Sequence, residues 1–259
     1  MKDTLQEAKP AVRVGVVGAA PAGATDQQAA SRAVQEMFGA IAPRYDLLNH
    51  VLSMNVDRLW WWRTARRFDP ILSNPGERVL DLCCGTGDMT FALEGRSRSR
   101  AKVVGADFAH PMLSRAAAKS AKREKALSWI EADALQLPFS GESFGLVTSA
   151  FGFRNLADYD AGLREILRVL RPGGECGILE CSEPEGIFGK VYGFYFREVL
   201  PKIGTALSGV RGPYSYLPAS VGRFPKPPEM LERMRAAGFR EATWTPYTFG
   251  IASLFWGKK

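Results

Sequence analysis

The chain has 259 residues, of which 46% are hydrophobic and 24% are charged, and its formal net charge is +7. This length and composition suit one α/β domain with a sizeable core and short extensions. No apolar run reaches the roughly 18 residues that span a bilayer, and we expect no signal peptide. The positive charge permits a nucleic-acid partner, but most of the Lys and Arg residues are explained as ordinary side chains on solvent-exposed helix and loop surfaces.

The cysteines and histidines do not predict a metal site. The four cysteines form no C-x-x-C pair, and His50 and His110 are the only imidazoles. Structural zinc sites need such ligands in close spacing. We therefore expect no metal and free thiols.

Residues 1–30 are rich in Ala, Gly, Gln and Pro without a clear period, and are expected to form a disordered extension. Residues 31–259 form the predicted domain. A helical pattern begins at Ser31, and residues 31–68 are predicted to be a helical lid over a pocket. On a helix the consecutive Trp60, Trp61 and Trp62 cannot all face one core, so at least one should be exposed. Tryptophan flanked by arginine suits a membrane interface or an apolar substrate tail, although burial against the sheet is the alternative.

A strand, a glycine turn and a helix start are predicted between Arg78 and Leu93. The apolar run of Val79, Leu80 and Leu82 stops at Gly85-Thr86-Gly87, and such a turn lets a ligand approach the backbone closely. A dinucleotide fingerprint needs a third glycine where Thr90 stands. Asp88 would also repel a pyrophosphate. A cationic ligand without phosphates, such as S-adenosylmethionine, fits this turn better.

Acidic residues follow the next two strands. Asp107 ends the run from Lys102 and follows Gly87 by about 20 residues, the spacing at which an acid reaches ribose hydroxyls. Asp133 follows the strand that begins at Trp129, and can hold the adenine amino group with the Ala134 amide nearby. Gly85, Gly87 and the two acids therefore predict a nucleoside-containing cofactor.

Strands and helices alternate through the rest of the chain. Strands are predicted at 144–149 and 175–180, helices at 114–125, 159–170 and 227–237, and two further strands between Phe239 and Trp256. This alternation favours a mostly parallel sheet covered by helices on both faces. Residues 186–225 are aromatic-rich and are predicted to be an insertion that walls an apolar pocket. The fourth strand lacks the Asn/Asp-Pro-Pro-aromatic motif of enzymes that methylate base nitrogens.

Several motifs outside the cofactor turn give the chain a specific resemblance. It resembles the prenylquinone C-methyltransferases, which methylate demethylmenaquinol or 2-polyprenyl-6-methoxy-1,4-benzoquinol. The resemblance covers about residues 37–258. The shared motifs are Tyr45-Asp46 with Asn49, Ser53 and Trp60; Val79-Leu80-Asp81-Leu82 with Gly85-Thr86-Gly87-Asp88; Leu137-Pro138-Phe139; Phe151-Gly152-Phe153-Arg154-Asn155; Arg168 to Gly174 continuing to Glu180-Cys181-Ser182; Leu200 to Gly204; and Tyr216 to Ser220.

The resemblance implies a Rossmann-like class I methyltransferase fold, with a seven-stranded sheet whose last strand is antiparallel. It also implies that Thr86, Asp107, Asp133 and Ala134 contact S-adenosylmethionine. Four positions depart from the family pattern: Cys84 and Ala150 replace other small residues, and His50 and Asp57 stand exchanged. We hypothesise that these last two side chains form an interacting pair.

The implied reaction joins the cofactor methyl group to a ring carbon of a prenylated quinol. Arg154 can stabilise the developing phenolate and Asn155 can orient the ring. Tyr45, Asp46 or His50 can accept the proton. The alternative for Arg154 is a strand-end salt bridge, and for Tyr45 a packed ring.

Demethylmenaquinol is the favoured substrate, with the benzoquinol as the alternative in the same class. Remoter alternatives are an RNA methyltransferase, which the missing strand-four motif opposes for nitrogen targets, and a non-catalytic partner that binds the cofactor. We expect no nucleic-acid partner and a cytoplasmic enzyme. Peripheral contact with the inner face of the membrane is compatible with the prenyl tail. A homo-oligomer is left open.

Overall fold

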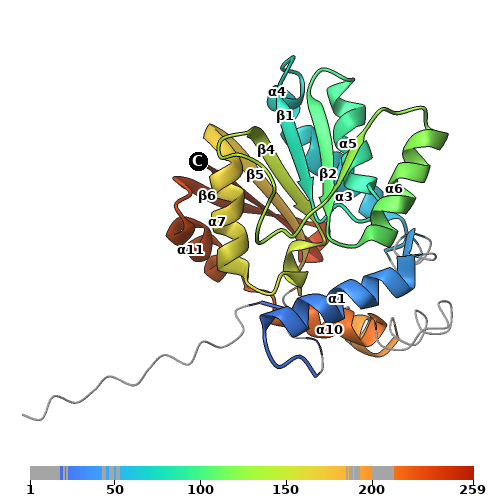
Figure 1. The fold of residues 1–259 in the computed structure, drawn as a ribbon. Coiled ribbons are helices and arrows are strands. Elements are labelled where there is room, and N and C mark those ends of the chain that lie inside the picture. Colours follow the sequence, from blue (N-terminus) through green and yellow to red (C-terminus); the bar gives the residue numbers. More distant parts are fainter. Residues whose placement is uncertain are drawn as a thin grey trace, which may run out of the picture.

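The chain folds around one seven-stranded sheet with the order β3-β2-β1-β4-β5-β7-β6 (Figure 1). The structure is a computed structural model that describes residues 18–19, 21, 23–42, 45–46, 50, 53–184, 186, 189, 193–199 and 213–259. The strands are β1 Arg78–Leu82, β2 Lys102–Asp107, β3 Ser128–Glu131, β4 Phe144–Ala150, β5 Leu170–Cys181, β6 Glu241–Tyr247 and β7 Ala252–Lys258.

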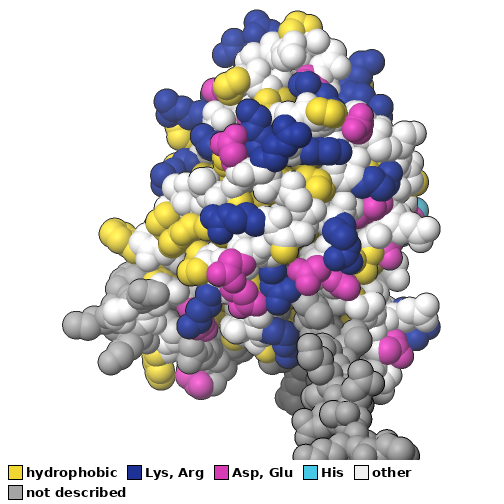
Figure 2. Space-filling view, turned by 90° about the vertical axis from the view of Figure 1, so that its left-hand side faces the viewer, with side chains coloured by type: hydrophobic (Ala, Val, Ile, Leu, Met, Phe, Trp, Pro, Cys, Tyr) yellow, Lys and Arg dark blue, Asp and Glu magenta, His cyan; other side chains and the backbone are white. Residues whose placement is uncertain are grey.

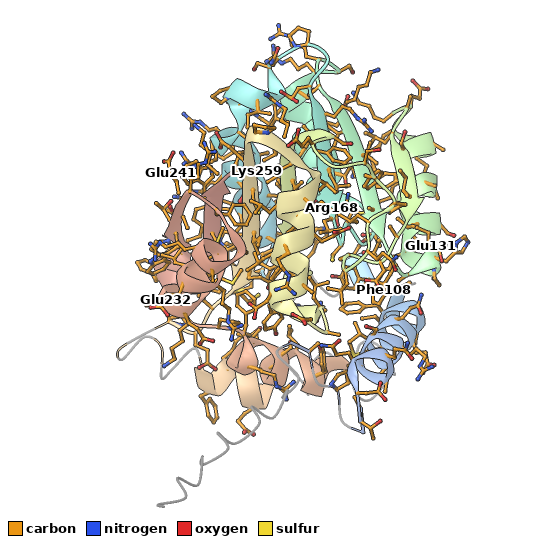
Figure 3. The ribbon with its side chains drawn as sticks, turned by 60° about the vertical axis from the view of Figure 1, so that its left-hand side comes forward. Phe108, Glu131, Arg168, Glu232, Glu241 and Lys259 are labelled. Carbon is orange, nitrogen blue, oxygen red and sulfur yellow. The ribbon has the colours of Figure 1, made fainter. Side chains whose placement is uncertain are left out.

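The sheet is parallel except for β7. β1 pairs in parallel with β2 and β4, β2 with β3, and β4 with β5, whereas β7 is antiparallel to both β5 and β6. Figure 3 shows Glu241 and Lys259 where β6 and β7 lie side by side, and Phe108 and Glu131 at the far carboxyl ends of β2 and β3. The predicted fold class, with its antiparallel last strand, is confirmed.

Helices cover both faces of the sheet, as predicted. α7 and α11 pack on one face, against β5, β6 and β7, while α3, α4 and α5 pack together on the other (Figure 1). α1 and α10 lie across the carboxyl ends of the strands. The helices are α1 Gln27–Ile41, α3 Val56–Arg67, α4 Asp69–Leu72, α5 Asp88–Ser97, α6 His110–Lys122, η2 Phe153–Asn155, α7 Tyr159–Val169, η3 Tyr195–Val199, α10 Pro213–Arg223, α11 Pro227–Ala237 and η4 Thr248–Gly250.

The N-terminal boundary differs from the prediction. Helix α1 begins at Gln27 rather than Ser31, because the Asp26 side chain caps it by accepting a hydrogen bond from the Ala29 N–H at 2.8 Å. Ala19 is buried, and its N–H donates to the Leu156 carbonyl at 2.7 Å. The packed part of the chain therefore extends before residue 31. Residues 1–17 lie outside the described residues.

The connection between α7 and β5 also differs from the prediction. The helix ends at Val169, and the strand begins at once with Leu170 instead of starting at residue 175. The proline and glycines of residues 172–174, which were expected to end the helix, lie instead inside the strand, beyond the last helical residue. Gly173 has φ 75° there, and the register between β4 and β5 shifts at Phe144.

Candidate active site

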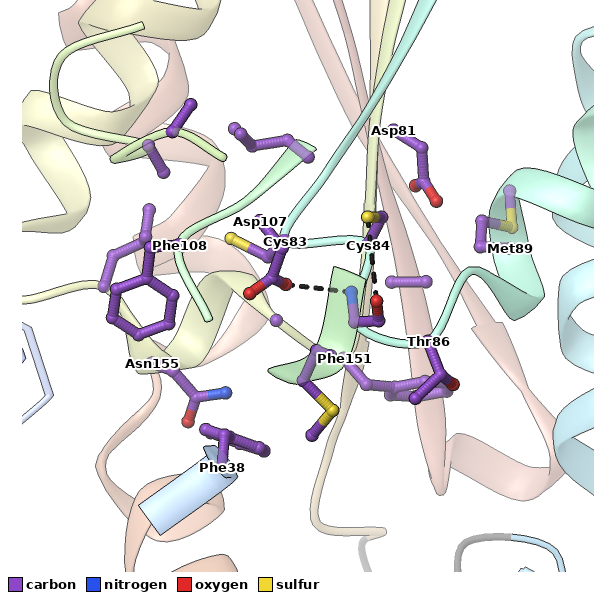
Figure 4. A pocket seen from close by; sticks show the side chains of 18 of the residues that line it. Phe38, Asp81, Cys83, Cys84, Thr86, Met89, Asp107, Phe108, Phe151 and Asn155 are labelled. Atoms are coloured by element: carbon purple, nitrogen blue, oxygen red, sulfur yellow. Dashed lines mark hydrogen bonds between the residues drawn. The ribbon is translucent and has the colours of Figure 1, made fainter. Parts of the chain in front are cut away.

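A pocket lies at the carboxyl ends of β1, β2 and β4, where a parallel sheet usually binds its ligand (Figure 4). Its volume is about 980 Å³, counting the space that is open to solvent. Each strand contributes lining residues, among them Asp81, Asp107 and Ala150. The pocket thus brings together the cofactor turn and the acids that the sequence predicted.

The cofactor turn, residues 83–87, needs its glycines for conformational and steric reasons. Gly85 has φ 55° and Gly87 has φ 90°, values that favour glycine. A Cβ at Gly87 would lie 2.5 Å from the indole ring of Trp129, and a Cβ at Gly105 would lie as close, at 2.5 Å. Gly87 in the turn and Gly105 on β2 therefore make room for one tryptophan beneath the turn.

Asp107 fixes the cofactor turn from β2. Its side chain is 7% exposed, and its two oxygens accept hydrogen bonds from the N–H groups of Gly85, at 2.8 Å, and Ala109, at 2.9 Å. Burial raises the pKa of Asp107, and the backbone N–H groups oppose this rise. Figure 4 shows the carboxylate at the pocket wall beside the turn. An acid held in this way can still accept bonds from two ribose hydroxyls, because each oxygen keeps a free lone pair.

Asp133 and Ala134 also line the pocket, from the loop that follows β3. The Asp133 carboxylate accepts a hydrogen bond from the Leu135 N–H at 2.8 Å, which holds it at the rim. This location suits the adenine end of the cofactor. The individual contacts of both residues with S-adenosylmethionine stay predictions.

Asp81 is a pocket residue that the sequence did not single out. It is fully buried, and it accepts hydrogen bonds from the hydroxyls of Thr90, at 2.6 Å, and Thr148, at 2.9 Å. Burial raises the pKa of Asp81 to about 7. A buried acid beside the turn favours a ligand with positive charge, and S-adenosylmethionine carries a sulfonium and an ammonium group. Inside an apolar strand, nothing in the local pattern reveals which way an aspartate points.

The predicted proton acceptors lie at different distances from the pocket. Tyr45 lines it, and the Tyr45 ring stands 6.0 Å from that of Phe38 on α1. Asp46 bonds to the hydroxyl of Thr86. His50 is not among the lining residues of the described chain; its Nδ1 lies 2.8 Å from the Asp57 carboxylate, and its ring packs at 5.9 Å from that of Trp61. The hypothesised contact between His50 and Asp57 is confirmed.

We expect the pair of His50 and Asp57 to act as a unit. Asp57→Ala and His50→Ala are each expected to lower methyl transfer about tenfold, and the double variant to be no worse than either, because both break the same contact. The measurement is the initial rate of transfer from labelled S-adenosylmethionine. Losses that multiply in the double variant would show two independent roles.

Arg154 and Asn155 occupy the turn η2 after β4 and point in different directions. The buried Arg154 guanidinium forms an ion pair with Glu180 at 2.9 Å and also donates to the Phe151 carbonyl. Asn155 lines the pocket, and its Oδ1 accepts a hydrogen bond from the Tyr216 hydroxyl at 3.2 Å. Arg154 is not among the lining residues of the described chain. The structure therefore shows the salt bridge that sequence reasoning gave as the alternative, and a catalytic role for Arg154 stays a prediction.

Solved structures with this fold include several S-adenosylmethionine-dependent methyltransferases. One from Thermotoga maritima, named as a possible histamine N-methyltransferase, superposes with a TM-score of 0.61 at 18% identity, over 87% of this chain and 99% of that one. The cyclase SpnF superposes with a TM-score of 0.65 at 19% identity, over 95% and 99% of the two chains. These likenesses define the fold, and together with the glycine turn and its acids they place the chain in the Rossmann-like methyltransferase class.

The family is defined by sequence. The ubiE/COQ5 methyltransferase family matches residues 25–259, and the chain belongs to this family. A demethylmenaquinone methyltransferase of Deinococcus radiodurans is 48% identical, over 90% of this chain and 95% of the relative. One of Thermus thermophilus is 47% identical, over 86% and 100%. A ubiquinone/menaquinone biosynthesis C-methyltransferase of Geobacter sulfurreducens is 41% identical, over 87% and 88%.

Proposed function

We propose that this enzyme transfers a methyl group from S-adenosylmethionine to a ring carbon of demethylmenaquinol and so forms menaquinol. The observation that carries the proposal is an aromatic wall beside the cofactor turn. Phe38, Tyr45, Trp61, Phe108 and Phe151 line the same pocket as Gly85 and Asp107. A flat fused ring can pack between such side chains. The names of the Deinococcus and Thermus relatives agree with this substrate.

The reaction requires the protein to align the quinol carbon with the methyl group of the cofactor, and it needs no covalent intermediate with the protein. S-adenosylmethionine supplies the electrophilic methyl group when it is bound. The quinol carbon next to a hydroxyl becomes nucleophilic as that hydroxyl loses its proton, and holding the reactants in line can contribute about 7–11 kcal/mol. Asn155 is placed to orient the quinol from the pocket wall. Tyr45 is the proton-acceptor candidate that lines the pocket, whereas Asp46 and His50 are not among the lining residues of the described chain.

Two segments supply the substrate side of this pocket in our proposal. Residues 31–68 act as the helical lid, which is supported by the lining positions of Phe38, Tyr45 and Trp61. Residues 186–225 act as the substrate-side insertion, which is supported by the hydrogen bond from Tyr216 on α10 to Asn155. Within this predicted insertion, residues 187–188, 190–192 and 200–212 lie outside the described residues.

Methyl transfer to two short-tailed quinols tests the substrate. Labelled S-adenosylmethionine is supplied with a demethylated naphthoquinol or with a methoxybenzoquinol, and the extracted quinol is counted. We expect label in the naphthoquinol. Label in the methoxybenzoquinol alone would favour the ubiquinone reaction, which the name of the Geobacter relative also covers. Cofactor binding with label in neither quinol would contradict the proposal and favour the RNA or partner alternatives.

We further propose that the enzyme works in the cytoplasm and contacts the inner face of the membrane, where a prenylated quinol resides. In the described part of the chain, no helix has the length and apolar character to cross a bilayer. Helix α3 and the neighbouring turn η4 offer a surface for peripheral contact. On it Leu59 is 49% exposed, Trp62 44% and Phe249 85%. A hydrogen bond of 2.8 Å from the Trp60 indole to Thr248 joins the two elements.

Basic residues complete this surface. The side chains of Arg58, Arg63 and Arg66 on α3 are exposed, and Arg66 stacks on Trp62 at 5.2 Å. Apolar side chains among arginines suit an anionic bilayer surface.

The face shown in Figure 2 also carries many Lys and Arg side chains, but Asp, Glu and apolar side chains lie among them. That face therefore offers no continuous basic band of the kind that nucleic acids need.

The double variant Leu59→Ser with Trp62→Ser is expected to bind vesicles of anionic phospholipid about tenfold more weakly than wild type, because it removes two apolar anchors. Co-sedimentation measures the bound fraction. Trp244→Ser is the matched control, because Trp244 is a tryptophan of similar exposure, 40%, on β6. Side chains alternate along a strand, and Trp244 lies three residues before Tyr247, whose ring packs against α3. Trp244 therefore points to the other face of the sheet, away from α3. Equal losses in the double variant and the control would contradict this docking surface.

A further inference from the structure

Lys119 on α6 contacts three oxygen atoms from two segments of the chain, namely the cofactor turn with the start of α5, and the segment that contains Asp46. Its ammonium lies 2.9 Å from the Thr86 hydroxyl, 2.9 Å from Asp88 and 2.9 Å from Asp46. The Lys119 side chain is 20% exposed, and those of Asp46 and Asp88 are 24% and 18% exposed. These ion pairs are sheltered, so solvent screens them less than it would screen pairs on an open surface.

The Thr86 hydroxyl is fully engaged within this cluster. Thr86 is 1% exposed, its hydroxyl donates to Asp46, and the same oxygen accepts from Lys119. The side chain therefore acts toward the protein, while the backbone of Thr86 belongs to the cofactor turn. If Thr86 contacts S-adenosylmethionine, as the family resemblance implies, this arrangement favours a contact through its backbone rather than through its hydroxyl.

The cluster joins two parts of the pocket that the chain does not connect locally. Thr86 and Asp88 line the pocket from the cofactor turn and the start of α5, and Tyr45 lines it from the segment that precedes α3 in the chain. Tyr45 precedes Asp46 directly, and its Cε1 would lie 3.9 Å from a Cβ at Gly85. Lys119 and Asp46 are absent from the lining of the described pocket, so they act through their neighbours.

We propose that Lys119 is a positioning residue that ties the cofactor turn to the segment of Tyr45 and Asp46, so that the turn holds its cofactor-binding arrangement before the ligand arrives. This inference rests on the proposed function only in taking S-adenosylmethionine as the ligand. A binding site that is already ordered loses less conformational freedom on binding and therefore binds more tightly.

Charge explains why a cation is needed at this position. Asp46 and Asp88 both approach the Lys119 ammonium, so without it two sheltered carboxylates would face each other and repel. Burial raises the pKa of Asp88, and the charge of Lys119 opposes that rise. Replacing Lys119 by methionine keeps most of the length of the side chain and removes the cation, which leaves Asp46 without its ion-pair partner beside Thr86.

Isothermal titration with S-adenosylmethionine measures the effect without any methyl acceptor. Lys119→Met is expected to raise the Kd about tenfold, and Thr86→Val, which removes only the hydroxyl, to raise it similarly. The double variant is expected to bind no more weakly than either single variant, because all three break the same unit. Thr86→Ser keeps the hydroxyl and is expected to bind like wild type. Lys122→Met, on the exposed side of the same helix, is the matched control and is expected to leave the Kd unchanged.

A rescue separates positioning from a general loss of structure. Lys119→Arg restores a cation that can reach both carboxylates, and its Kd is expected within about threefold of wild type. The inference is overturned if Lys119→Met binds the cofactor like wild type, if its losses multiply with those of Thr86→Val, or if arginine is no better than methionine. Failure of label transfer to both quinols by the wild type would refute the proposed reaction and leave this binding test intact.

Discussion

Asp107→Asn is expected to lower the affinity for S-adenosylmethionine, and with it methyl transfer at low cofactor concentration, at least about 100-fold. Each hydrogen bond to a charged group contributes about 1.5–3 kcal/mol, and two ribose hydroxyls would bond to this carboxylate. Asparagine also harms the site itself. Both Asp107 oxygens accept from backbone N–H groups, and an amide NH₂ would face one of those donors. Titration calorimetry gives the Kd, and the labelled-quinol assay gives the rate.

Asp133→Asn provides the comparison for this loss. Asp133 is more exposed and accepts one backbone hydrogen bond, so its replacement is expected to cost about tenfold, as for one hydrogen bond to a charged group. The assignment of Asp107 as the acid that contributes most to cofactor binding would be wrong if Asp107→Asn bound the cofactor like wild type and Asp133→Asn did not.

Arg154→Met is expected to lower the free energy of unfolding by about 3–5 kcal/mol. Glu180 is fully buried, and removing its partner leaves an uncompensated buried charge. The backbone N–H of residue 154, which donates to Glu180 at 2.9 Å, is kept in this variant, so the loss reports on the guanidinium contacts alone. For a chain of this size each kcal/mol lowers the melting temperature by roughly 2–4 °C, so calorimetric or fluorescence melting detects the change.

A second replacement separates stability from catalysis at Arg154. Adding Glu180→Leu to Arg154→Met removes the remaining charge and is expected to restore part of the lost stability. If Arg154 acts only through structure, this double variant regains turnover along with its fold. A variant that melts like wild type but has lost turnover would show that the guanidinium reaches the substrate, as the sequence first suggested.

Features that depend on nearby residues could be predicted from the sequence. The apolar strand, the glycine turn and Asp107 are linked by short connections, so their spacing alone located the cofactor site. Helix α11 begins and ends at the predicted residues, Pro227 and Ala237, because proline starts it and Gly238 ends it with φ 113°. The sheet followed from the alternation of strands and helices.

Features that depend on distant contacts could not be predicted. Lys119 meets Asp46 and Thr86 only after α6 has packed beside the turn, and within its own basic helix it looks like any solvated lysine. The two neighbours Arg154 and Asn155 face different environments because successive side chains of the 3-10 turn η2 point about 120° apart. Composition cannot tell which of the two enters the pocket. Asp26 was overlooked as a cap because the residues around it show no hydrophobic period.

The contact of Trp129 with Gly87 and Gly105 has a consequence for how this family can diverge. A Cβ at either glycine would come within 2.5 Å of the ring, so a substitution at one of the three positions requires a change at another. A homologue with alanine at the position of Gly105 is expected to carry a smaller side chain in place of Trp129. Coupled substitution of this kind produces covariation between position 105 on β2 and position 129 on β3, which are partners in the sheet. Such covariation would identify homologues with the same packing beneath the cofactor turn, even where Gly85 and Gly87 do not change.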